Sequence, residues 1–207
     1  MFAVVESGSI TSMPKGNKGV KIGDYNYPPA AFTLWTEAER NAVGIYTVEI
    51  DNTNFKDNKW YTNTDITYAY DASSNKVKGT YGSATAKAHA DTKWTQSEID
   101  AGKAPSGADT NTVKTEGLKT KLIRNIKESA ESILNKTDWY ITRKTEEDIA
   151  IPSSITTHRK AVRTKQASME TAITNAADTP ALETLYTYTK QEDGSFTRPL
   201  GDLPTLS

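Results

Sequence analysis

Residues 113–136 read VKTEGLKTKLIRNIKESAESILNK, and this stretch decides the second half of the fold. Its apolar residues recur at spacings of four, four, four and three, which places them on one stripe of an amphipathic helix. The residues of this stripe are Leu118, Leu122, Ile126, Ala130 and Ile133. The sequence therefore predicts a long helix here.

A second apolar stripe follows Pro152, which opens a new helix together with Ser153 and Ser154. Its members on one side are Ile155, His158, Val162, Met169 and Ile173, and Asp178-Thr179-Pro180 closes it. Two stripes of similar length, joined by about twenty residues, indicate an antiparallel helical hairpin. A shorter helix around residues 181–185 and a polar tail complete the chain.

The first half is rich in aromatic and β-branched residues, since thirteen of the eighteen Phe, Trp and Tyr side chains lie at or before Trp94. A short helix is expected at 36–41, with Thr36 and Glu39 spaced as a capping box and Gly44 ending it. Residues 14–23 are expected to form a loop, and Pro28-Pro29 an extended segment. The predicted strands are 2–6, 9–12, 45–50, 59–62, 65–70 and 77–81.

These patterns predict an α+β protein, in which a small antiparallel β-rich N-terminal domain precedes an antiparallel α-helical hairpin. The expected boundaries are 1–100 for the β-rich domain, 101–112 for a linker, and 113–207 for the hairpin with its C-terminal tail. The linker is inferred from its small and polar residues, AGKAPSGADTNT.

The composition excludes several kinds of chemistry and of partner. The chain has no cysteine, which excludes disulfides and thiolate chemistry, and its net charge of -1 offers no excess of positive charge for nucleic acid or an anionic membrane. The apolar run Phe2–Val5 is too short for a signal peptide or a membrane span. We therefore expect synthesis in the cytoplasm and no nucleic-acid or membrane partner.

Residues for catalysis, metal binding or cofactor binding are not evident. The two histidines, His89 and His158, are isolated in the sequence, and His158 falls on the apolar side of the second helix. The segment 51–58 lacks the calcium-loop pattern, so an Asx-type turn is the preferred interpretation. The glycines at 16, 19 and 23 lack phosphate-loop spacing. We predict a non-enzymatic protein without cofactor or metal.

Two other groups of side chains have alternative interpretations. The basic residues Arg159, Lys160, Arg163 and Lys165 could mark a nucleic-acid face, but a solvated helix face is favoured because no aromatic residue is interleaved with them. The Trp and Tyr residues between Trp60 and Tyr81 could bind a glycan or another protein. Packing into a core is the preferred interpretation for them.

A segment between the two stripes resembles a module of bacteriophage tail proteins, the tail fibre assembly or tail assembly chaperone family. The resemblance lies in Thr137-Asp138-Trp139-Tyr140, Arg143-Lys144, Ile151-Pro152 and the helix start His158-Arg159 through Arg163, although the family usually has Tyr where this chain has His158. A weaker likeness covers the N-terminal segment and 44–48. Trp139 is expected to plug the end of the hairpin, and Thr137 or Asp138 to end its first helix.

The resemblance implies a virion tail component that mediates protein–protein assembly, with no catalytic residues. Its expected partners are other phage tail proteins, such as tail fibre, tail tube or baseplate subunits, in a symmetric oligomer within the particle. A tail fibre assembly chaperone and a receptor- or glycan-binding tail protein remain alternatives. The residues expected to form the partner or structural motif are Asp138, Trp139, Tyr140, Arg143, Pro152, Arg159 and Arg163.

Overall fold

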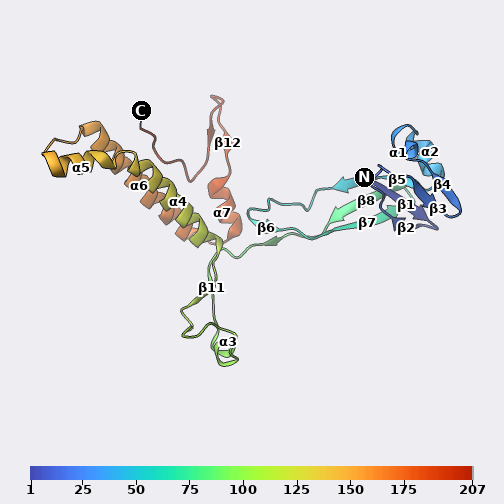
Figure 1. The fold of residues 1–207 in the computed structure, drawn as a ribbon, viewed down its shortest axis with the longest axis horizontal. Helices are drawn as coiled ribbons and strands as arrows, with labels where there is room; N and C mark the ends of the chain where they lie inside the picture. The colour runs from blue at the N-terminus through green and yellow to red at the C-terminus, as the bar shows by residue number, and fades with distance from the viewer. Residues whose placement is uncertain (207) are drawn as a thin grey trace. The chain divides into compact units, whose positions relative to one another are not determined.

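The computed structural model describes residues 1–206 and divides the chain into two compact units, Met1–Thr85 and the chain from Ala86 onward. The first unit is rich in strands and the second in helices, so the predicted α+β class is confirmed (Figure 1). The division lies at 85/86, and not at the predicted linker. Residues 101–112 instead lie within the second unit, between helix α3 (Gln96–Asp100) and strand β11 (Val113–Thr115).

A five-stranded sheet forms the first unit, in the order β2-β1-β5-β8-β7. Its strands are β1 (Phe2–Glu6), β2 (Ser9–Ser12), β5 (Ile45–Asp51), β7 (Ile66–Asp71) and β8 (Lys76–Tyr81). The sheet was predicted to be antiparallel, but β5 and β8 pair in parallel, with Val48 opposite Val77. The reason is that the chain leaves the sheet after β5 and returns as the β7–β8 hairpin, so that β8 enters in the direction of β5.

Small and aromatic side chains fill one face of this sheet. Its buried cluster is Ala3, Val5, Tyr46, Val48 and Val77, against which Ile10, Met13, Tyr68 and Tyr70 pack. Gly79 in β8 leaves room for these neighbours, because a Cβ there would lie 2.8 Å from Tyr68 Cε1. The hydroxyls of Tyr46 and Tyr70 share a hydrogen bond of 3.3 Å, and this contact, together with burial, raises the pKa of Tyr46 to about 12.

Short elements cover the other face through a cluster centred on Ala31, Phe32 and Ile45. They are α1 (Ala30–Thr33), α2 (Glu37–Ala42), β3 (Val20–Ile22) and β4 (Tyr25–Tyr27). The capping box on α2 is confirmed. Two expectations were wrong: the 14–23 loop contains β3, and Pro29 caps α1 with helical angles, which the fixed φ of proline permits. Strands β6 (Tyr61–Thr62) and β9 (Thr85–Ala86) form a separate pair.

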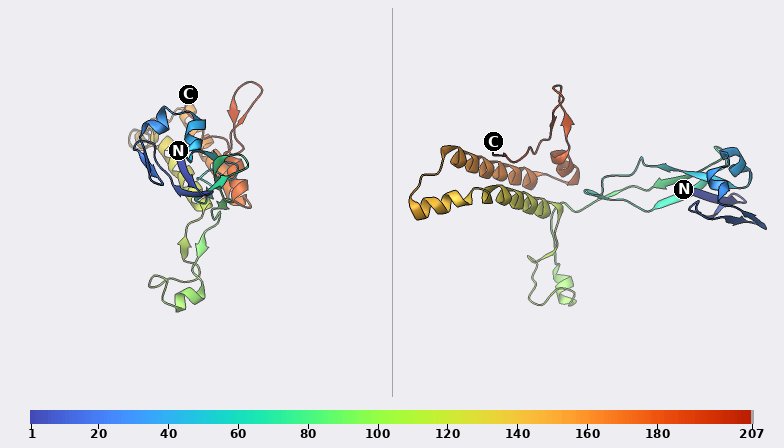
Figure 2. Two further views of the ribbon diagram at one scale, coloured as in Figure 1. Left: turned by 90° about the vertical axis from the view of Figure 1, so that its right-hand side faces the viewer. Right: turned by 45° about the horizontal axis from the view of Figure 1, so that its top comes forward.

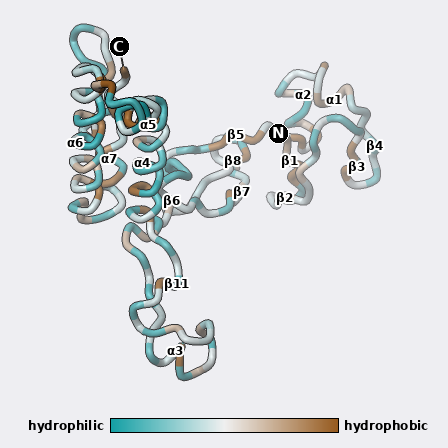
Figure 3. The backbone as a smooth tube through the Cα atoms, turned by 60° about the vertical axis from the view of Figure 1, so that its left-hand side comes forward, coloured by the Kyte–Doolittle hydropathy of each residue, from teal (hydrophilic) through white to brown (hydrophobic). Residues whose placement is uncertain are grey.

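The second unit is built on a helical hairpin, as predicted. Helices α4 (Leu118–Asn135) and α6 (Ser153–Asn175) lie side by side, joined by α5 (Asp138–Glu147), and α7 (Thr179–Tyr186) follows (Figure 2). The predicted stripes face the core: Leu122, Ile126 and Ala130 are buried on α4, and all five predicted residues are buried on α6. Figure 3 shows apolar positions recurring along both helices, between polar ones.

The start of α4 is fixed by the chain that precedes it. Asp91 accepts hydrogen bonds from the Gly117 backbone N–H and the Thr120 hydroxyl, both at 2.7 Å, and they lower its pKa. Gly117 is required there, because a Cβ would lie 2.3 Å from the carbonyl carbon of Ala90. The helical body is thereby tied to residues 88–91.

Two hairpins extend from this helical body. One contains β10 (Thr92–Lys93), α3 and β11, and the other consists of β12 (Thr189–Lys190) and β13 (Phe196–Thr197). Within the first hairpin, Lys114 pairs with Glu98 and lies over the ring of Trp94. The hydrogen bond from Lys114 and those from Thr95 lower the pKa of Glu98 to about 2. After β13 the tail turns back, and Leu200 is buried.

Acid is expected to loosen the first hairpin through Glu98. Its pKa is lowered from an ordinary 4.5 to about 2, so its stabilising effect is present above pH 4.5 and is lost as the pH falls toward 2. The measurement is the pH dependence of the Trp94 indole resonance by NMR, compared with Glu98→Gln, which keeps the capping geometry but cannot ionise. Identical profiles for both proteins would contradict this role of Glu98.

Candidate functional site

Helix α5, which the sequence patterns did not predict, connects the two long helices at the turn of the hairpin (Figure 2). It has ten residues, and none of them is buried. A helix this short is marginal in water when it stands alone, and most helices in proteins are stabilised by packing one apolar face. Only Tyr140 and Arg143 are half-buried and the other eight residues are exposed, so the surface of α5 is the first candidate for a contact with another molecule.

Three side chains of α5 form one stacked group, which we call the α5 cluster: Trp139, Tyr140 and Arg143. The rings of Trp139 and Tyr140 lie 3.9 Å apart, centroid to centroid. The Arg143 guanidinium lies 4.7 Å from the Trp139 centroid and 5.4 Å from that of Tyr140. Trp139 was expected to plug the hairpin, but it is 51% exposed, because the chain bends before α5 and carries this residue away from the α4–α6 core.

Arg159 of α6 holds the junction between α4 and α5. Its side chain is buried, with the residue only 6% exposed, and its Nη1 donates to Leu134 O and Thr137 Oγ1, each at 2.7 Å. The same nitrogen lies 2.7 Å from Asp138 Oδ1 in an ion pair. One guanidinium thus satisfies a carbonyl at the end of α4 and a carboxylate in the first turn of α5.

The junction differs slightly from the expectation that Thr137 or Asp138 ends the first helix. Helix α4 ends at Asn135, whereas Thr137 precedes α5 as its N-cap residue and Asp138 begins it. The Thr137 hydroxyl is buried and donates back to Leu134 O at 2.9 Å. The two helices are therefore joined by a fixed bend of two residues.

The other motif residues lie on or next to α6. Pro152 occupies the N-cap position of α6, as expected for a residue that starts the second helix. Arg163 is exposed one turn after Arg159 and, with Leu134, lines a groove beside α6. The basic set does not form one solvated face, because Arg159 is buried beneath the junction while Lys160 and Arg163 are exposed.

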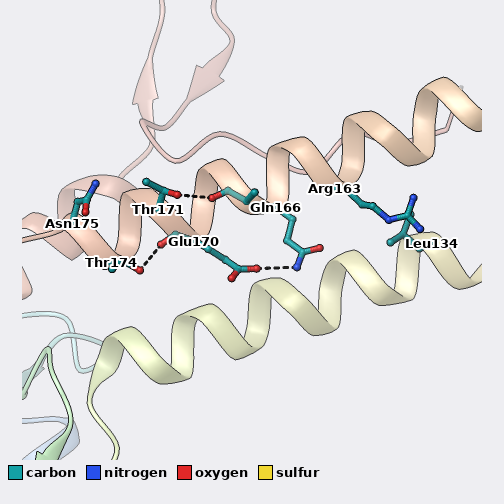
Figure 4. Close-up of a pocket in the computed structure, with 8 residues that line it drawn as sticks. Leu134, Arg163, Gln166, Glu170, Thr171, Thr174 and Asn175 are labelled. Carbon is teal, nitrogen blue, oxygen red and sulfur yellow. Dashed lines mark hydrogen bonds between the residues drawn. The ribbon is translucent and has the colours of Figure 1, made fainter.

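An open groove beside α6 is lined by Leu134, Arg163, Gln166, Ala167, Glu170, Thr171, Thr174 and Asn175 (Figure 4). Four of its polar side chains have partners on α6: Gln166 donates to Glu170 at 2.8 Å, and the Thr171 and Thr174 hydroxyls donate to backbone carbonyls of α6. Such satisfied groups do not call for a ligand.

The remaining candidates have structural roles. In the 51–58 segment, Asp51 accepts from the Thr53 backbone N–H at 2.9 Å, so the Asx-type turn is confirmed. Trp60 and Tyr61 are buried, while Tyr68 and Tyr70 pack on the sheet core, which confirms core packing for these aromatics. Within residues 1–206, His, Asp and Glu side chains form no group suited to a metal ion, and no helix is long and apolar enough to cross a membrane.

Sequence reasoning named every residue of the α5 cluster but not their arrangement. The spacing of four residues between Trp139 and Arg143 could have indicated that their side chains meet, because residues four apart on a helix are neighbours. It was missed because residues 138–147 carry no apolar stripe, so no helix was predicted there.

No protein-family model, curated protein or solved structure matches the chain. The likeness of residues 134–163 to a phage tail module therefore stands on the sequence motif alone. The α5 cluster and its Arg159 anchor are independent of that likeness, because they are features of this chain's own structure.

Proposed function

We propose that the chain is a non-enzymatic component of a bacteriophage tail, which joins neighbouring tail proteins through the α5 cluster. The observation that carries the proposal is an exposed helix with no buried residue, presenting a stacked Trp and Arg. The tail assignment is supported by the motif that runs from Thr137 to Arg163. Tail fibre, tail tube or baseplate subunits, arranged symmetrically in the virion, are the partners proposed.

The composition of the cluster suits a protein contact. Trp, Tyr and Arg are the residue types that most often dominate the binding energy of protein interfaces. Burial of Trp139 by a partner would also supply the apolar packing that α5 lacks in the free chain. Because the Arg159 anchor orders the helix beforehand, little entropy would be lost on docking.

Replacement of Trp139 with alanine tests this proposal in particles. We expect the variant to bind its neighbour at least about thirtyfold more weakly, the loss typical of an interface hot spot, and its copy number in purified particles to fall. The measurement is quantitative mass spectrometry of particles that carry each variant. The matched control is Phe196→Ala, which removes an aromatic side chain that is 62% exposed on another part of the same unit and should leave the copy number unchanged.

Equal incorporation of the Trp139 variant and the natural chain would overturn the role of the cluster. A chain that is absent from particles, yet raises the yield of soluble tail fibre on co-expression, would instead be an assembly chaperone. The receptor- or glycan-binding alternative has less support than the other two, because Trp60 and Tyr61 are buried and Tyr68 and Tyr70 are partly buried against the core.

A further inference from the structure

We infer that the start of helix α6 binds an oxyanion, a carboxylate or phosphate group carried by a small molecule, and that His158 is one of the residues that hold it. The site lies on a different helix from the α5 cluster, and the inference goes beyond the proposed function. The site is a hollow of about 410 Å³ between the first turns of α6 and the last described residues of the tail. Its lining residues are Ser153, Ser154, Thr157, His158, Thr205 and Leu206.

The His158 side chain is the feature that points to a ligand. Only 8% of this residue is exposed, and it lines the hollow. Within residues 1–206, its ring has no hydrogen bond and no ion pair. Its ring nitrogens are still open to the hollow, in contrast to the enclosed Nε atoms of Arg40 and Arg143. A buried polar group without a partner is unfavourable, and this one faces space that a ligand can enter.

The first turn of α6 supplies further donors. Pro152 occupies the N-cap position, and no side chain caps the helix. The N–H of Thr156 is the first to reach a carbonyl, that of Pro152. The preceding N–H groups, of Ser153, Ser154 and Ile155, are therefore free to bind a ligand. They also lie at the positive end of the dipole of a 23-residue helix, where an anion is stabilised.

Helix α4 shows how this chain satisfies such donors with its own groups. The N–H groups of residues 117–119 donate to the Asp91 carboxylate at 2.7 Å and to two backbone carbonyls of residues 88–89 at 2.9 Å. Among residues 1–206, no such acceptor reaches the start of α6. The two helix ends therefore differ in what they can accept from outside the chain.

The chemistry of the lining favours an oxyanion. Backbone N–H groups, an imidazole ring and three side-chain hydroxyls can all donate, and no carboxylate side chain lines the hollow. The acidic residues 146–148 precede Pro152 and are not part of the lining. Residues 138–165 together carry six cationic and four acidic side chains, so their net charge also attracts an anion. The size of the hollow admits a small molecule, and Leu206 offers an apolar contact to its body.

Titration of the full chain with acetate, acetamide and inorganic phosphate tests the inference. The two anions separate a carboxylate from a phosphate, and acetamide has the shape of acetate without its charge. Binding is followed at constant pH and ionic strength through the amide resonances of residues 153–155 and the ring resonances of His158 in NMR. We expect one or both anions to shift these resonances saturably and to bind at least about tenfold more tightly than acetamide. Amides 117–119 should not shift, because the chain already satisfies them.

Variants locate the binding. His158→Leu keeps a buried apolar side chain without a donor, and it is expected to weaken anion binding at least about tenfold. Thr157→Val removes one hydroxyl from the lining and should weaken binding about threefold. The matched control is Thr156→Val, which changes a neighbouring exposed threonine outside the lining and should leave the affinity unchanged. Folding of each variant is checked by circular dichroism, and Thr157→Val decides the test if His158→Leu does not fold.

Three results would each overturn the inference. The first is the absence of a saturable shift at residues 153–155 with either anion at up to about 0.1 M. The second is acetamide binding as tightly as the better anion, which would show that the site does not select a charge. The third is unchanged anion affinity in folded His158→Leu protein. If acetate and phosphate differ in affinity, the tighter of the two identifies the group that the site takes.

Discussion

Replacement of Arg159 with alanine is expected to lower the free energy of unfolding of the helical unit by about 2–3 kcal/mol. The change removes hydrogen bonds from a buried cation to Leu134 O and Thr137 Oγ1, together with the ion pair to Asp138. Complete loss of a buried ion pair costs more than this, but the Asp138 side chain is half exposed and water can solvate it afterwards. Urea denaturation followed by circular dichroism gives the measurement.

The Arg159→Met variant separates the polar contribution of Arg159 from its packing contribution, because methionine fills much of the same volume but donates no hydrogen bond. Both variants should also increase amide hydrogen exchange at the start of α5, since the bend between α4 and α5 loses its anchor. A loss of stability in the alanine variant that methionine fully restores would show that Arg159 acts by packing alone, and would contradict its role as the anchor.

Replacement of Ile173 with alanine is expected to cost about 3–4 kcal/mol of unfolding free energy. Ile173 is fully buried on α6, and a cavity at this position would weaken the packing of the hairpin. The control is Ile149→Ala, which shortens an exposed isoleucine just after α5 and should change stability by less than about 0.5 kcal/mol. Equal effects of the two substitutions on urea denaturation would mean that the stripe does not form the core.

The helical hairpin could be predicted because its stripes are local patterns. Leu122, Ile126 and Ala130 repeat with the period of a helix, and Val162 and Ile173 belong to a similar pattern on the second helix. The capping box at Thr36 is likewise readable over four residues. Such features depend on neighbours in the sequence, and the structure confirms them.

Features that depend on distant residues could not be predicted in this way. The parallel pairing of Val48 with Val77 depends on which strand returns beside β5, and no local pattern specifies that choice. The boundary of the two units was misplaced for a similar reason, because the small polar residues 101–112 mark a loop of the hairpin between α3 and β11.

The sequence predicted which residues belong to the candidate site better than it predicted how they are arranged. Asp138 and Arg159 belong to one sequence motif, and in the structure they form an ion pair. The motif gave no sign that Arg159 is buried, because an arginine beside other basic residues on a helix is usually solvated. Exposure of Trp139 was also unexpected, since burial of an aromatic residue depends on where the chain bends.

Hydrogen exchange of α5 in free protein and in purified phage particles tests the central claim most directly. We expect amides 138–147 to exchange faster in the free chain, where α5 buries no residue and only its start is anchored by Arg159, than in particles, where the proposed tail neighbour would cover the α5 cluster. Equal exchange rates in the two states, or purified particles that do not contain the chain, would contradict the claim.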